Sequence, residues 1–110
     1  MIIVSDRICD FFSWFFRVGG ITLWPFIIVR KETSEKTIRH EQIHIAQYNE
    51  TLVIGFLLIY LFEWIWYLAI LPDYDAKKAY KSIRFEKEAY ANSKFPDYMK
   101  FRSHYNWRKY

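Results

Sequence analysis

The N-terminal part of the chain has a hydrophobic pattern that predicts a short helix followed by a strand. Apolar and aromatic residues recur at helical spacing over residues 8–18 (ICDFFSWFFRV), and Gly19-Gly20 would end this helix. Residues 21–31 (ITLWPFIIVRK) are rich in β-branched and aromatic side chains and predict a strand. Pro25 lacks a backbone N–H, so we expect this strand to lie at the edge of a small sheet or to contain a bulge. The unpaired backbone groups of such an edge either pair with an extended peptide or only form the rim of the sheet.

Helical patterns dominate the rest of the chain. A helix is expected over residues 36–49, with Thr33 or Ser34 as its N-terminal cap. Residues 52–71 (LVIGFLLIYLFEWIWYLAIL) contain one charged residue, Glu63, in twenty positions, which is the length of a membrane span. Because this segment is apolar on all sides, we expect it to contact lipid or a partner subunit, or to bend and pack more compactly than a straight rod.

The last helical segment is expected over residues 75–93, with Asp73 or Asp75 as its cap. Its apolar stripe consists of Ala76, Ala79, Tyr80, Ile83 and Tyr90. The chain has no internal repeat or linker, and 110 residues are enough for one hydrophobic core. The pattern therefore predicts a single compact domain over residues 1–110, of α+β class and mostly α, with a small edge-strand sheet and three to four helices.

Charge and cysteine content exclude several classes of function. The 16 Lys and Arg residues are interleaved with 12 acidic residues and form no basic run, so we expect no nucleic-acid partner. The net charge of +4 suits an anionic membrane surface better. The single cysteine, Cys9, excludes an intramolecular disulfide and a cysteine-based zinc site, and we expect it to be a small buried hydrophobe. The N-terminus lacks the basic region of a secretory signal, so a cytoplasmic or membrane-associated location is expected.

The strongest chemical pattern in the sequence is HEQIH at residues 40–44, an instance of the H-E-x-x-H zinc motif. Positions four apart lie on the same face of a helix, so His40 and His44 can both bind one Zn²⁺ through bonds of ~2.0–2.1 Å. Glu41 is turned about 100° from His40 around the helix axis. It can contact a metal-bound water without binding the metal, which is the position of a general base. The alternative is an exposed helical turn that contains these residues by chance.

A catalytic zinc site needs a third protein ligand beside an open position, and three acids are candidates. Glu86 lies on the apolar stripe of the last helix, where a carboxylate needs a partner such as a metal. Glu88 is about 200° away around the same helix, where a solvated acid is expected. Glu63 follows His44 with eighteen residues between them, a spacing that some H-E-x-x-H enzymes use. We rank Glu86 first, Glu88 second and Glu63 third.

An H-E-x-x-H motif followed by a later E-x-E-A helix resembles the gluzincin metallopeptidases, in particular the membrane-associated ones. The order of segments also resembles that of small bacterial and phage proteins with the same motif. The resemblance implies a zincin-like domain with a third-ligand glutamate three residues before an alanine, which here pairs Glu86 with Ala89. That family usually has Asp after the alanine, and this chain has Tyr90. The register shifted by two residues pairs Glu88 with Ala91 and fits about as well.

These residues predict zinc-dependent hydrolysis of a peptide or protein substrate. His40, His44 and Glu86 would hold Zn²⁺, which lowers the pKa of its water toward ~7, and Glu41 would pass the water's proton to the leaving amine. The expected donor to the oxyanion is one of Tyr90, Tyr98, His104 and Tyr105. The alternative function is a membrane-surface or assembly protein, contacting lipid or a partner subunit through residues 52–71, with a structural or vestigial metal site.

A shared metal site also constrains the path of the chain. One straight helix from His44 to Leu71 would be ~40 Å long, whereas the helical return from Asp75 to Glu86 covers only ~17 Å. The chain must therefore bend before the apolar helix, and residues 49–55 are where it can. A metal site of this kind excludes a straight, single membrane span over the apolar segment.

Overall fold

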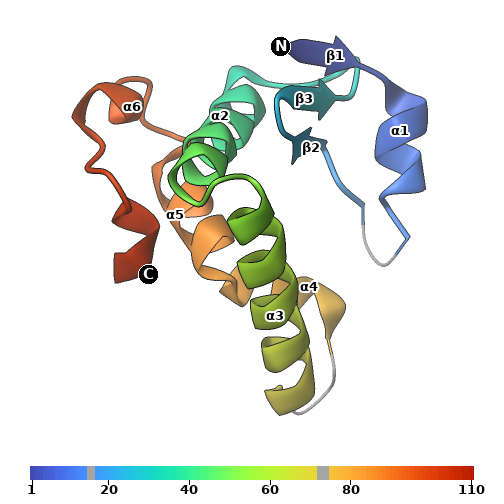
Figure 1. Ribbon diagram of the computed structural model, residues 1–110. Helices are drawn as coiled ribbons and strands as arrows, with labels where there is room; N and C mark the ends of the chain where they lie inside the picture. Colours follow the sequence, from blue (N-terminus) through green and yellow to red (C-terminus); the bar gives the residue numbers. More distant parts are fainter. Residues whose placement is uncertain (15–16, 72–74) are drawn as a thin grey trace.

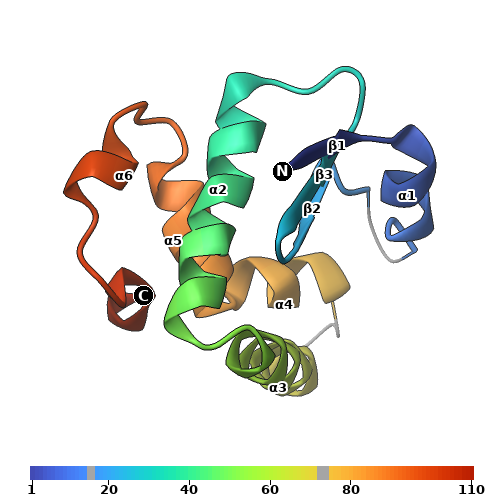
Figure 2. The same ribbon diagram turned by 45° about the horizontal axis from the view of Figure 1, so that its top comes forward.

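The helix that carries the HEQIH motif lies between a small sheet and the C-terminal part of the chain. The computed structural model describes residues 1–14, 17–71 and 75–110. Its elements form a compact α+β fold in which helices predominate, as the sequence predicts. Figure 2 shows the motif helix, α2 (Glu35–Glu50), with the sheet on one side and α5 (Arg84–Asn92) and the C-terminal segment on the other.

The sheet has three strands in the order β1-β3-β2 (Figure 1). β1 (Ile2–Val4) pairs with β3 (Phe26–Val29) in parallel, and β2 (Gly20–Leu23) pairs with β3 antiparallel. The prediction of one strand over residues 21–31 is therefore wrong. Trp24–Pro25, whose peptide bond is cis, forms the turn of a hairpin, where the missing N–H of proline costs no ladder hydrogen bond. β2 lies at an edge of the sheet and packs against α2, but β3, the other part of the predicted edge strand, is the central strand.

The N-terminal helix is shorter than its hydrophobic pattern suggests. α1 (Asp6–Phe11) begins at Ser5, whose hydroxyl accepts a hydrogen bond from a backbone N–H of the first turn. Just after the end of the helix, the Ser13 hydroxyl donates to the Cys9 carbonyl (2.7 Å). Part of the predicted helix, residues 15–16, lies outside the described residues. Cys9 is fully buried, as expected.

The bend required by a shared metal site is present between α2 and α3 (Ile54–Ile70). The two helix axes meet at 112°. Leu52 and Val53 at the break both have positive φ angles, of 58° and 65°. Within the described ranges, no single helix is both long and apolar enough to cross a membrane. α2 and α3 together have the necessary length and composition, but they are bent at this break.

α3 buries one side against the protein and exposes the other. The core cluster consists of Tyr48, Phe56, Ile83, Phe85 and Trp107. Four partly buried residues at the start and on the inner side of α3 pack against it: Val53, Ile59, Tyr60 and Trp64. The outer side, which we call the apolar face of α3, carries exposed large side chains, namely Ile54, Leu57, Leu58, Leu61, Phe62, Ile65, Trp66 and Ile70. The chain therefore covers only one side of its most apolar helix.

The single helix predicted over residues 75–93 is two helices, α4 (Ala76–Ser82) and α5. The break lies at Ile83, which has an extended ψ of 133° and is completely buried. The Arg84 backbone N–H donates to Glu63 Oε1 (3.0 Å), so a carboxylate from α3 satisfies the start of α5. The break changes the direction of the chain, and the apolar stripe of α4 therefore does not continue along α5.

Helix caps agree with the sequence where they can be compared. Ser34, and not Thr33, caps α2 by accepting a hydrogen bond from the backbone N–H of Thr37 (3.2 Å). The Asp75 carboxylate caps α4. The other candidate cap, Asp73, lies outside the described residues.

The C-terminal segment folds back onto α5. It contains α6 (Tyr98–Phe101) and the 3₁₀ helix η1 (Asn106–Lys109). Trp107 is buried against Phe85, with ring centroids 4.7 Å apart. This segment therefore covers the side of α5 that faces away from the sheet (Figure 1).

Candidate metal centre

Three buried side chains converge between α2 and α5. His40 Nε2 and His44 Nε2 lie 2.9 and 3.1 Å from Glu86 Oε1, and the two imidazole nitrogens are 3.2 Å apart. In a tetrahedral complex with bonds of ~2.0–2.1 Å, neighbouring ligand atoms are ~3.3 Å apart. The three atoms are already close to that spacing, so this group can hold a metal ion.

Helix packing explains why these residues meet. His40 and His44 are four residues apart on α2 and point toward α5, which packs along it. Glu86 lies in the first turn of α5, just after the break at Ile83. Its second oxygen, Oε2, accepts a hydrogen bond from the Tyr60 hydroxyl of α3 (2.7 Å). Tyr60 was not predicted as part of the site, although a hydroxyl on the inner side of an apolar helix is a polar group that needs a partner.

Gln47 sets the orientation of His44. The Gln47 amide nitrogen donates to the Phe85 carbonyl (3.0 Å) and to Glu88 Oε1 (2.9 Å), which are both acceptors. The amide oxygen must therefore accept from His44 Nδ1, which lies 2.7 Å away. A neutral His44 thus carries its proton on Nδ1 and turns the Nε2 lone pair toward Glu86 and His40.

The expectation that Glu88 is a solvated acid is wrong. Its side chain is 0% exposed and accepts hydrogen bonds from Gln47, Tyr98 and Arg102. Burial on this side of α5 comes from the C-terminal segment, which no helical periodicity within α5 reveals. Glu88 therefore supports Gln47 and does not contact the imidazoles.

Glu63 also lies away from the histidines. Its carboxylate accepts from the Arg84 backbone and forms an ion pair with the Arg84 guanidinium (2.6 Å). Of the three acids considered as third ligands, Glu86 reaches both imidazoles, and Glu63 and Glu88 have other partners.

Glu41 lies beside the three converging side chains without joining them. Its Oε2 is 3.9 Å from His40 Nε2, and its Oε1 accepts from the Thr22 hydroxyl of β2 (3.0 Å). Burial raises the pKa of Glu41, and the neighbouring His44 and His40 only partly oppose this increase. A carboxylate with a raised pKa is a better proton acceptor near neutral pH, which is what a general base requires.

The charges at the centre favour a cation. Burial alone would lower the pKa of His44, but the Glu86 carboxylate more than offsets this effect and raises that pKa to about 9. In the opposite direction, His44 and His40 hold the pKa of Glu86 well below its usual value despite burial. The buried carboxylate thus stays ionised and needs a positive charge beside it, which a proton or a metal ion can supply.

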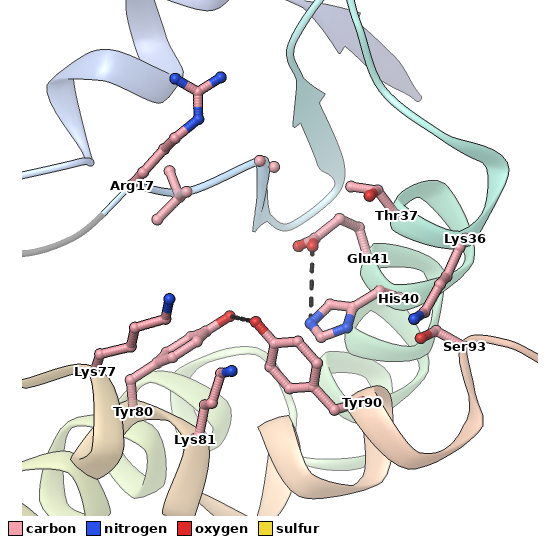
Figure 3. Close-up of a pocket in the computed structure, with 13 residues that line it drawn as sticks. Arg17, Lys36, Thr37, His40, Glu41, Lys77, Tyr80, Lys81, Tyr90 and Ser93 are labelled. Carbon is pink, nitrogen blue, oxygen red and sulfur yellow. Dashed lines mark hydrogen bonds and ion pairs between the residues drawn. The ribbon is translucent and has the colours of Figure 1, made fainter.

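Two tyrosines stand in front of the centre (Figure 3). The Tyr80 and Tyr90 hydroxyls are 2.9 Å apart, and the Tyr90 ring lies 4.5 Å from the His40 ring. Both tyrosines line a cavity of about 300 Å³ that also reaches His40 and Glu41. The sequence named Tyr90 as a candidate donor but did not place Tyr80 there.

The other three candidate donors lie elsewhere. Tyr98 donates to Glu88 (2.6 Å), and the Tyr105 backbone donates to Glu50 (2.8 Å). His104 lies 3.6 Å from Glu50 and its side chain is 93% exposed. None of the three lines the cavity beside His40 and Glu41.

No protein-family model matches this chain, and no curated protein or solved structure is significantly similar to it. The resemblance to the gluzincins therefore stays a prediction from two motifs. A chemical assignment rests on the positions of the chain's own residues.

Proposed function

We propose that this protein is a zinc-dependent peptidase. The observation that carries the proposal is the convergence of His40, His44 and Glu86 at distances suited to a tetrahedral ion, with Glu41 beside them. Two imidazoles and one carboxylate form a donor set that catalytic zinc sites use with the fourth position open. A structural zinc site is closed by four protein ligands, and among the described residues this group has three.

The surrounding residues suit hydrolysis by water. Zinc, when bound, supplies a Lewis acid that polarises a carbonyl and acidifies water. Glu41 takes the proton of the attacking water and delivers it to the leaving amine, while Thr22 holds its carboxylate in place. Tyr90 and Tyr80 present hydroxyls on the cavity side, where a donor to the developing oxyanion is needed.

The edge of β2 supports a peptide as the substrate. The Arg30 N–H donates to the Gly19 carbonyl (3.3 Å), so this pair is joined across the hairpin. Hydrogen bonds alternate along an antiparallel pair, which turns the N–H and C=O of Gly20 toward the free edge. Gly20 lines the cavity next to Glu41, and a Cβ added there would lie 3.4 Å from Glu41 Cγ. An extended peptide can pair with this edge and pass in front of Glu41.

Metal content and cleavage together test the proposal. The purified protein is expected to contain about one zinc per chain and to cleave members of a mixed set of quenched fluorescent peptides. A chelator should stop cleavage, and added zinc should restore it. The double variant His40→Ala/His44→Ala should lose both zinc and cleavage, while His104→Ala, which changes the remaining, exposed histidine, should keep both. Stoichiometric zinc in the double variant, or a zinc-loaded protein that cleaves no peptide, contradicts the proposal.

The apolar face of α3 favours a second candidate function, attachment to a membrane surface. Exposed tryptophans lie on α3 (Trp66), at the hairpin turn (Trp24) and after α1 (Trp14), and tryptophan is enriched at membrane interfaces. The net charge of +4 fits anionic lipid. Flotation with vesicles of anionic lipid should carry the protein upward, and replacing Leu58 and Phe62 by Glu should prevent this. A stable dimer without vesicle binding would instead assign the face to a second copy.

A further inference from the structure

Two cavities of opposite character meet at Glu41. One, the basic pocket, has a volume of about 300 Å³ and lies between α2, α4 and residues 17–20. The other, the apolar pocket, has a volume of about 490 Å³ and lies between β2 and α3. The two cavities share four lining residues: Val18, Gly20, Glu41 and Tyr80. A ligand that contacts Glu41 can therefore reach both cavities.

The basic pocket is lined by four cationic side chains, Arg17, Lys36, Lys77 and Lys81 (Figure 3). Within the part of the chain that the structure describes, no ion pair joins any of them to a carboxylate. Lys81 Nζ lies 5.3 Å from the centre of the Tyr90 ring, which places one of these charges close to the metal centre. The acid in the wall is Glu41, which is buried. Figure 3 shows the Arg17 guanidinium turned away from the two tyrosines, whereas the Lys77 and Lys81 amino groups lie beside them. Cationic side chains at a cavity that form no ion pair with a described carboxylate attract an anionic group.

The apolar pocket has the opposite composition. Its wall is formed mainly by hydrophobic side chains, which include Ile21, Leu23, Phe56, Leu57, Leu61 and Trp64. Its inner end reaches His44 and Glu86, so this pocket also opens onto the metal centre. A hydrophobic side chain of a ligand gains from burial there.

We infer that the substrate is a peptide with a carboxylate on one side of the cleaved bond and an apolar side chain on the other. This inference rests on the proposed peptidase function. The basic pocket receives the carboxylate, which comes from an acidic side chain or from the C-terminus. The apolar pocket receives the hydrophobic side chain. A peptide is favoured over an anionic lipid because the outer edge of β2 borders both cavities and turns the backbone N–H and C=O of Gly20 outward for pairing, while the Thr22 carbonyl on the same edge accepts from the Tyr48 hydroxyl (2.9 Å).

A matched peptide set tests this substrate class. Each peptide contains one Leu. Glu, Gln or Lys is placed at a single position, which is one of the two before the Leu or one of the two after it. Every peptide is made both with a free and with an amidated C-terminus. We expect kcat/KM for the preferred Glu position, or for the free C-terminus, to exceed that of the neutral counterpart by about tenfold. The comparison of Glu with Gln tests an acidic side chain as the source of the carboxylate, and the comparison of free with amidated peptides tests the C-terminus. The preference should weaken at high salt, because these cations lie at the surface.

Two double lysine variants distinguish the effect of the cations in the basic pocket from the effect of the protein's net charge. Lys77→Ala/Lys81→Ala removes two cations of α4 from the pocket and should bring the ratio for acidic over neutral peptides close to one. Lys87→Ala/Lys109→Ala removes the same charge from exposed positions outside the pocket and should leave that ratio unchanged. An unchanged ratio in the first variant overturns the inference.

The remaining outcomes distinguish this inference from the function on which it rests. Equal cleavage of the Glu, Gln and Lys peptides overturns the substrate class and leaves the peptidase function standing. Zinc binding with no cleavage of any peptide overturns the peptidase function itself. Vesicles of anionic lipid that bind the native protein but not Lys77→Ala/Lys81→Ala, in the absence of any carboxylate preference, assign the basic pocket to lipid instead.

Discussion

Hydrogen bonds to single atoms decide which atoms face the metal site. The Gln47 amide oxygen accepts a hydrogen bond from His44 Nδ1–H, because the Gln47 amide nitrogen already donates to two other acceptors. Tyr60 likewise occupies one oxygen of Glu86 and leaves the other facing both imidazoles. These contacts orient the three candidate ligand atoms in the absence of a metal, which would reduce the entropy lost if a metal ion binds.

Replacement of Gln47 by Leu tests this orientation. Leu keeps most of the side-chain volume but cannot accept a hydrogen bond from His44 Nδ1–H, so we expect zinc affinity to fall by about 10–100-fold. A competition titration with a fluorescent zinc chelator measures the change. Gln42→Leu, at an exposed position of α2, is the matched control and should bind zinc as the native protein does. Unchanged affinity in Gln47→Leu would show that the amide does not orient His44.

Replacement of Glu41 by Gln separates base from ligand. The amide keeps the shape of the side chain and its contact with Thr22 but cannot take a proton. We expect peptide cleavage to fall by about 10²–10⁴-fold while zinc stays bound in stoichiometric amount. Single-turnover cleavage and metal analysis on the same sample give both quantities. Loss of zinc from this variant would make Glu41 a ligand.

At the scale of elements, two breaks in the chain bring the site together. The turn between α2 and α3 sends the apolar helix back at 112°. The break at Ile83 starts α5 where Glu86 can reach α2. Glu63 links α3 to the second break, because this α3 residue accepts from the backbone at the start of α5. Elements separated in sequence thus hold one another in position.

Replacement of Glu63 by Ala tests that link. The start of α5 loses its acceptor and Arg84 loses its ion pair, so we expect thermal unfolding to show a loss of about 1–2 kcal/mol. Zinc binding should remain stoichiometric, because Glu63 does not contact the imidazoles. Glu32→Ala, in the exposed loop before α2, controls for the loss of one acid. A Glu63→Ala protein that folds but has lost its zinc would reopen the choice of third ligand.

At the scale of the whole molecule, the C-terminal segment closes the side of α5 away from the sheet. Arg102 forms ion pairs with Glu50 at the end of α2 (2.7 Å) and with Glu88 on α5 (2.6 Å). Its side chain and both carboxylates are buried, so each charge depends on the others. The end of the chain therefore contributes to the support behind Gln47 and His44.

Acid should weaken this closure. Burial would raise the pKa of Glu50, but hydrogen bonds from Arg102 outweigh burial and lower that pKa below its ordinary value of 4.5. A carboxylate with a lowered folded-state pKa adds stability above its unfolded pKa, and this stability is lost as the pH falls through the folded pKa. Glu50→Gln should therefore be less stable than the native protein at neutral pH, and the difference should shrink below about pH 4.5. Urea unfolding across the pH range measures it, and a difference that is the same at every pH contradicts this account.

The sequence predicted those features that depend on residues close together in the chain. The helix with His40 and His44 on one face follows from helical periodicity alone, and Glu41 is placed by the same geometry. The bend near residues 49–55 was predictable because one metal site and two helix lengths leave few paths for the chain. Glu86 was ranked first because a single helix over residues 75–93 would place it on an apolar stripe. The break at Ile83 removes that reason, although Glu86 does reach both imidazoles.

Other features were not predictable because they depend on contacts between distant segments. The hairpin, the short strand β1 and the separation of α4 from α5 have weak local patterns, and pairing or burial decides them. Glu86 and Glu88 lie on opposite sides of one helix and are both buried.

The sequence by itself therefore determined the motif helix, its two histidines and its neighbouring acid, because a helix repeats over a few residues. Tertiary structure alone decided which glutamate meets the histidines. The packing of α5 on α2 brings Glu86 to His40, which is 46 residues away in the sequence. Arg102 of the C-terminal segment forms an ion pair with Glu88. No local pattern contains that choice, because burial at one position depends on segments that are far away in the sequence.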